Sequence, residues 1–163
     1  MSRFKWLLGL ILIALMAASG TALADDIENT DLGFGFWAPD AWAQDADGDT
    51  FTMTSEDGLA IVFMDVPADS LEAALEGMEE GLEGITLTEE GEPEEIEIGG
   101  MPALIAEAKG TMEGNDIELF IVVLIPPKAA EKDQATLIFG LGTPAAIEAN
   151  EADIEKFVTS FKA

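Results

Sequence analysis

The strongest constraint on the fold is a run at residues 117–125 that is almost wholly apolar. In an extended chain successive side chains point to opposite faces, so Ile121 and Val123 would occupy one face and Phe120 and Val122 the other. Neither face offers a polar side chain to water at these positions. Such a strand is stable only in a sheet that is covered on both faces. The sequence therefore predicts a central strand between two layers.

Two segments with helical periodicity can supply that cover. In the first, residues 69–85, Asp69 and Glu72 have the spacing of a capping pair. Its apolar stripe consists of Leu71, Leu75, Met78, Leu82 and Ile85. The second follows a cap predicted at Asn150 and places on one face Ile154, Phe157, Val158 and Phe161. Glycines and like charges make the first segment a poor helix by itself, so we expect it to form only against a sheet.

Strands are predicted where apolar side chains alternate or run together, at residues 33–42, 50–55, 59–66, 95–98, 101–111, 117–125 and 135–141. Asp57-Gly58 indicates a hairpin, and turn or loop composition marks residues 45–49, 86–95 and 128–134. This order of elements predicts one α+β domain, an antiparallel sheet of about six to seven strands with a helix on each face.

The first 24 residues have the pattern of a secretory signal peptide. Arg3 and Lys5 precede an apolar run that is too short to span a bilayer, and Ala22-Leu23-Ala24 forms a cleavage motif. The sequence predicts cleavage after Ala24, a flexible start at residues 25–32, and one domain at residues 33–163 that is periplasmic or secreted. An uncleaved anchor is the alternative. The chain has no cysteine, which excludes a lipid-modified cysteine at the cleavage point.

Acidic residues outnumber basic residues 33 to 7, and the formal net charge is −26 at pH 7. Loss of the leader would remove two of the cations and none of the acids, leaving −28. A surface of this sign repels nucleic acid and anionic membrane surfaces, so we expect neither as a partner. The expected partners are cations or a protein with a basic patch. The alternative is that the charge serves only solubility or adaptation to salt.

The chain has no histidine, cysteine or tyrosine, which removes the usual general base, the commonest transition-metal ligands and the phenolic acid. Ser55, Ser70 and Ser160 have no base to activate them and fall in turn, cap and helix contexts. Four aromatic residues could line an apolar ligand pocket, although aromatic side chains in a strand more often form core: Phe34, Phe36, Trp37 and Trp42. We therefore expect a non-enzymatic domain without a cofactor.

One acidic segment has the spacing of a calcium-binding loop. Acids occupy positions 1, 3, 5 and 12 of that spacing, namely Asp45, Asp47, Asp49 and Glu56. Thr50 stands at position 6, where the bend of such a loop requires glycine, and the predicted flanking elements are strands. The segment predicts either low-affinity calcium binding or a plain surface turn.

Glutamates form two further clusters. One lies on the outer face of the first predicted helix and comprises Glu72, Glu76, Glu79, Glu80 and Glu83, and the other falls within residues 89–95. A divalent ion or a basic patch on another protein could bind there, with an association that weakens as salt rises. A solvated surface without a partner is the alternative.

Four short motifs resemble the PsbP-like fold family. They are Pro39-x-x-Trp42, the hairpin from Ser55-Glu56-Asp57-Gly58 to Ala60-Ile61-Val62, the strand entry Ile98-Gly99-Gly100-Met101-Pro102-Ala103, and the closing Phe157-Val158-Thr159-Ser160-Phe161. The family takes in the extrinsic photosystem II protein PsbP, the Ran-binding factor Mog and exported bacterial domains. The resemblance implies an antiparallel sheet with helices on its two faces, used as a docking module. Plant members are linked to histidine metal sites, a role that no position here can inherit.

Overall fold

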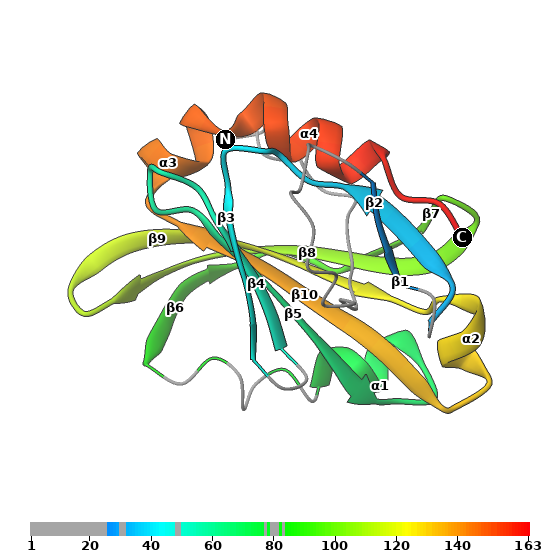
Figure 1. Cartoon of the computed structure of the whole chain (residues 1–163). Coiled ribbons are helices and arrows are strands. Elements are labelled where there is room, and N and C mark those ends of the chain that lie inside the picture. The colour runs from blue at the N-terminus through cyan, green and yellow to red at the C-terminus, as the bar shows by residue number, and fades with distance from the viewer. Residues whose placement is uncertain (1–25, 30–31, 48–49, 77, 79–81, 83) are drawn as a thin grey trace.

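The computed structural model describes residues 26–29, 32–47, 50–76, 78, 82 and 84–163 (Figure 1). The leader predicted at residues 1–24 lies outside them. Most of the described chain forms one antiparallel sheet of eight strands, in which seven follow the order β3-β4-β5-β10-β9-β8-β6 and β7 also pairs with β8. The strands are β3 (Ala43–Asp47), β4 (Thr50–Thr54), β5 (Ala60–Pro67), β6 (Ile85–Glu90), β7 (Glu94–Ile98), β8 (Met101–Met112), β9 (Asn115–Leu124) and β10 (Gln134–Gly142).

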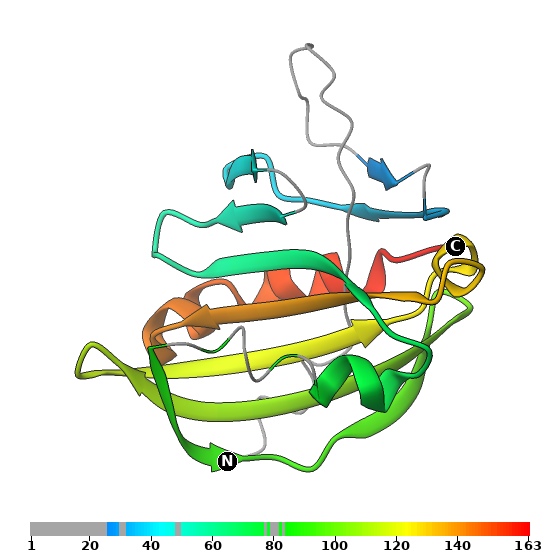
Figure 2. The same ribbon diagram turned by 90° about the horizontal axis from the view of Figure 1, so that it is seen from below.

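Helices cover both faces of this sheet. On one face lie α3 (Pro144–Ala149) and α4 (Glu151–Thr159), together with a two-stranded sheet of β1 (Asp26–Asn29) and β2 (Phe34–Trp37). On the other face lies the six-residue α1 (Leu71–Glu76), which contacts β8, β9 and β10 (Figure 2). The predicted α+β architecture is confirmed, with one or two more strands in the sheet than expected.

The strand predicted to lie between two layers does so. In β9, Phe120 and Val122 belong to the core under α3 and α4, and Ile121 and Val123 belong to the core under α1. All four are at most 4% exposed. We call the two sides of the sheet the α4 face and the α1 face. Burial on both sides explains why the sequence of β9 contains no clear alternation of polar and apolar residues.

Aromatic rings join β2 and the C-terminal segment to the α4 face. The ring of Phe36 stacks on Phe161 at a centroid distance of 5.2 Å and meets Phe157 edge to face at 5.5 Å. Backbone hydrogen bonds between Gly35 and Lys162 hold the chain end beside β2. Phe36 and Phe157 are fully buried, as their predicted place in the core requires. Of the helical face predicted after Asn150, Ile154, Phe157 and Val158 are confirmed on α4, whereas Phe161 is buried just beyond the helix, which ends at Thr159.

The helix predicted at residues 69–85 is wrong in its length and its cap. Helix α1 ends at Glu76, and Ile85 begins strand β6. The Ser70 hydroxyl, and not Asp69, accepts the N–H of Ala73 and caps the helix. Glutamate repulsion and glycine already made a long helix unfavourable here. Residues 86–90, predicted as part of a connection, instead form most of β6, because β8 supplies an edge with which their backbone pairs.

Other predictions near the ends of elements are also corrected. Residues 26–29, expected to be flexible, form β1, whose Ile27 packs against the core. The aromatic strand predicted at residues 33–42 ends at Trp37. The loop after β9 contains the short helix α2 (Pro127–Ala130). Asn150 stands at the start of α4 but makes no side-chain capping bond.

Candidate functional site

Carboxylates cover the outside of the molecule. Every acidic side chain whose burial the structure describes is exposed or half-buried, and the half-buried ones are Asp65, Glu107, Glu118 and Asp153. Seven cations could neutralise at most seven of the 33 acids, so the surface keeps a strong negative field whatever pairs form. The location of the acids relative to apolar surface is therefore the informative feature.

Strand register places acids at both edges of the α1 face. Side chains of directly paired residues point to the same face of a sheet. One row of paired residues crosses the sheet in the order Asp47, Thr50, Met64, Leu137, Val123, Leu104 and Glu95. A parallel row begins with Asp45, Thr52, Val62 and Phe139. The two rows have acids at the β3 edge and apolar residues over the middle strands.

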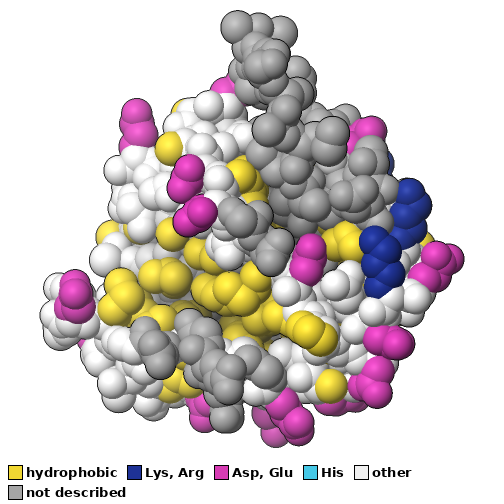
Figure 3. Space-filling model, turned by 60° about the horizontal axis from the view of Figure 1, so that its bottom comes forward, with side chains coloured by type: hydrophobic (Ala, Val, Ile, Leu, Met, Phe, Trp, Pro, Cys, Tyr) yellow, Lys and Arg dark blue, Asp and Glu magenta, His cyan; other side chains and the backbone are white. Residues whose placement is uncertain are grey.

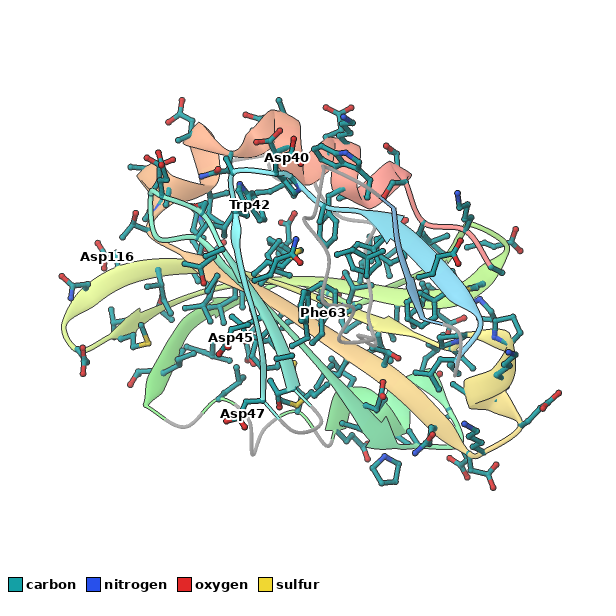
Figure 4. The ribbon with its side chains drawn as sticks, in the orientation of Figure 1. Asp40, Trp42, Asp45, Asp47, Phe63 and Asp116 are labelled. Atoms are coloured by element: carbon teal, nitrogen blue, oxygen red, sulfur yellow. The ribbon has the colours of Figure 1, made fainter. Side chains whose placement is uncertain are left out.

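Of the turn predicted at residues 45–49, residues 45–47 belong to strand β3, and residues 48–49 lie outside the described residues. The backbone of β3 pairs with β4, with Asp45 opposite Thr52 and Asp47 opposite Thr50, so pairing outweighs the low strand propensity of aspartate. Both carboxylates are exposed, and both belong to the lower half of β3 in Figure 4. The result is a pair of anionic side chains that border the α1 face.

The middle of the α1 face is incompletely covered over β5. Val62, Met64 and Val66 pack against the α1 core but remain half-buried, and we call these three residues the β5 strip. Helix α1 lies over β8 to β10, and no described helix lies over β5 (Figure 2). Figure 3 shows hydrophobic side chains gathered on this side of the molecule with Asp and Glu side chains around them.

The partner surface predicted from sequence is described only in part. Glu72 and Glu76 are exposed on α1, one helical turn apart, whereas Glu79, Glu80 and Glu83 lie outside the described residues. Sequence reasoning missed the β5 strip because it assigned a long helix to cover the whole face. In β5 Ile61 and Phe63 are buried, whereas the alternate residues Val62 and Met64 are half-buried. The sequence is apolar at all four positions, so it carries no signal that separates the two faces of this strand.

The predicted calcium ligands do not form a loop in the described part of the chain. Asp45 and Asp47 lie on β3, whereas Glu56 follows the far end of β4, since Thr54 pairs with Ala43. No group of three or more acidic side chains in the described residues is arranged to hold a metal ion. Asp49 lies outside the described residues, so calcium binding by this segment stays an untested alternative.

Two lysines show how cations are used on this surface. Lys109 lies between Glu89 of β6 and Glu118 of β9 in register, and its Nζ is 3.6 Å from a carboxylate oxygen of Glu89. Lys156 of α4 lies over the ring of Trp37, 3.6 Å from its centroid. Trp37 is half-buried, while Trp42 and the β2 phenylalanines are in the core, as predicted. These surface contacts contribute little to stability. Two lysines are also too few to reverse the negative electrostatic field of the surface.

The three serines have the structural roles predicted for them. The Ser55 hydroxyl accepts the N–H of Leu59 in the β4–β5 turn, and Ser70 caps α1. Ser160 accepts the N–H of Trp37 at 2.8 Å and donates to the carbonyl of Phe157 at 2.6 Å. Each of the three hydroxyls thus makes hydrogen bonds that hold the backbone in place.

Among the described residues no helix has both the length and the apolar character needed to cross a membrane.

The fold is PsbP-like. The structure matches cyanobacterial PsbP (CyanoP) of Synechocystis sp. PCC 6803 with a TM-score of 0.60 at 13% identity, covering 91% of this chain and 98% of that one. It matches LpqN of Mycobacterium tuberculosis, a protein involved in cell envelope biogenesis, with a TM-score of 0.60 at 12% identity, covering 80% and 82%. A Bacteroides thetaiotaomicron protein matches with a TM-score of 0.50 at 12% identity over 80% of this chain and 44% of that one. No protein-family model and no curated protein matches the sequence.

Proposed function

We propose that the chain is an exported, non-enzymatic docking domain of the cell envelope that binds a cationic partner protein through its acidic surface. The observation that carries the proposal is the net charge of −26. Because the carboxylates of known burial are exposed or half-buried, this charge acts on approaching molecules and is not consumed in the core. Such a field accelerates association with basic patches and opposes association with nucleic acid or anionic lipid.

Two independent features support the proposed location in the envelope. The leader has the composition of a signal peptide, with cleavage proposed after Ala24. The fold is shared with LpqN, which is involved in cell envelope biogenesis. At 12% identity this likeness concerns the fold. It is compatible with a location in the envelope, and it does not identify a pathway.

The absence of catalysis is proposed from chemistry. The chain has no histidine, and Ser55, Ser70 and Ser160 all serve backbone geometry, so none of these three serine hydroxyls is paired with a base. No cofactor is needed for docking. The calcium alternative is supported only by the spacing of Asp45, Asp47, Asp49 and Glu56, and the structure adds no observation in its favour.

The test is the salt dependence of partner capture. The full chain, expressed with its own leader and carrying a tag after Ala163, is purified from the envelope fraction and immobilised. Envelope extract is then applied at about 50 mM salt, and bound protein is eluted with rising salt, with a near-neutral domain on matched beads as the control. We expect a specific partner that is released by about 0.5 M salt. Full retention at about 1 M, where screening acts within roughly 3 Å, contradicts an electrostatic interface.

A further inference from the structure

We infer that the β5 strip binds an amphipathic helix of another protein, one with apolar side chains on one face and lysine or arginine beside them. This inference rests on the proposed function and deepens it, because it names the surface and the chemistry of the partner. Its basis is the juxtaposition of an incompletely covered apolar strip with carboxylates of two flanking elements.

The strip has dimensions that suit one helix. Val62, Met64 and Val66 are alternate residues of one strand, so they extend over about 13 Å. At 1.5 Å per residue, about nine residues of a helix span that length, enough for apolar side chains at positions i, i+4 and i+7. Met64, at the centre, has an unbranched side chain that adapts to different partner surfaces.

The neighbouring elements leave room for that helix and supply its ionic contacts. Helix α1 contacts β8, β9 and β10, and the middle strand of these, β9, lies two strand spacings, about 10 Å, from β5. Helices pack side by side at 8–10 Å, so a second helix fits over β5. Two strand spacings, about 10 Å, separate Met64 from Asp47 in the same row. Lysine or arginine on one flank of a bound helix therefore reaches Asp45 and Asp47. On the other flank, the exposed Glu72 and Glu76 of α1 add to the negative field that attracts the helix.

Charge complementarity decides between possible occupants. A second copy of this chain in a two-fold contact would bring Asp45 and Asp47 against the same residues or against Glu72 and Glu76, all of them anionic. Like charges in such a contact oppose association. A neutral apolar helix would bury the strip but leave the flanking carboxylates without partners. A cationic amphipathic helix satisfies both the apolar strip and its acidic borders.

The test uses a synthetic 18-residue leucine–lysine amphipathic helix with a fluorophore, and its leucine–glutamate counterpart as control. Binding to the full protein is measured by fluorescence anisotropy at low and high salt. The border variant is Asp45→Asn with Asp47→Asn, and the strip variant is Met64→Gln. The matched control, Glu148→Gln with Glu155→Gln, removes the same charge from exposed positions on α3 and α4. Thermal unfolding of each variant verifies that it remains folded.

We expect the leucine–lysine peptide to bind, the border and strip variants each to weaken it about fivefold or more, and the control variant to change it less than twofold. Spin-labelled peptide should broaden the methyl signals of Val62, Met64 and Val66 in the wild-type protein, a readout that does not depend on any variant. Equal weakening by the control variant, equal binding of the leucine–glutamate peptide, or broadening confined to other methyl groups overturns the inference. These outcomes leave salt-sensitive capture of an envelope partner intact, so the proposed function is tested separately.

Discussion

The ring of Phe120 on β9 lies over the backbone of Gly140, its paired residue on β10. A Cβ placed at Gly140 would overlap ring carbons of Phe120, well inside the 3.0 Å that such atoms tolerate. Phe120 is 0% exposed and belongs to the α4-face core, so its ring has no solvent to move into. The glycine is therefore required by a side chain on the neighbouring strand and not by its own backbone angles.

We predict that Gly140→Ala lowers the free energy of unfolding by about 3 kcal/mol, because a methyl group is forced into a packed core. Urea unfolding followed by circular dichroism measures the loss. Gly142→Ala is the matched control, since a Cβ there meets Leu59 at an ordinary 3.4 Å. In a Phe120→Ala background the Gly140→Ala cost should largely disappear. An undiminished cost in that background means that the ring is not the obstacle.

Asn150 connects the α3–α4 junction to the β4–β5 turn. Its side-chain nitrogen donates to the carbonyl of Ala146 at 2.8 Å, to a carboxylate oxygen of Asp57 at 3.3 Å and to the Ser55 hydroxyl at 3.4 Å. We predict that Asn150→Ala costs about 2 kcal/mol of unfolding free energy, because it removes the donor from two buried acceptors, the Ala146 carbonyl and the Ser55 hydroxyl. A double-mutant cycle with Ser55→Ala should give a coupling of about 1 kcal/mol. Strict additivity of the two substitutions would count against the connection.

The sequence predicted the elements whose pattern is set by local periodicity. β9 is apolar on both faces and lies between layers, the Asp57-Gly58 hairpin joins β4 and β5, and α4 buries one face. These features depend on residues that are close in the chain, so a pattern of period 2 or 3.6 is enough to identify them.

What the sequence did not predict depends on pairing between distant segments. Asp47 and Glu95 lie at opposite ends of one row, a relation that follows from six strand pairings and cannot be read from their separation of 48 positions in the sequence. The composition around Asp45 predicted a turn, but pairing with β4 makes this segment a strand, and that pairing is not visible in the local sequence. The candidate site, an apolar strip between acids, was therefore beyond local reasoning, although the acids themselves were identified.

For calcium, we predict no saturable binding. In β3 the alternate residues Asp45 and Asp47 are about 7 Å apart along the strand, and about 13 Å of β4 separates the partner of Asp47 from Thr54. Calcium requires six to eight oxygens around one point. Isothermal titration calorimetry at millimolar calcium should show only weak heat. The double variant Asp45→Asn with Asp47→Asn should change this heat no more than the control double variant Glu148→Gln with Glu155→Gln does. Saturable heat that only the first pair abolishes would establish the calcium alternative.

Salt should stabilise the folded protein. With 33 acids and seven cations, folding brings like charges closer together, and β7 alone contributes the exposed Glu94, Glu95 and Glu97. Raising sodium chloride from about 10 mM to about 0.5 M shortens the screening length from roughly 30 Å to a few ångströms and relieves this repulsion. We predict a higher Tm by differential scanning calorimetry, and a smaller rise in a variant with all three β7 glutamates changed to glutamine. A Tm that stays flat or falls over this range would show that self-repulsion does not limit the stability of the fold.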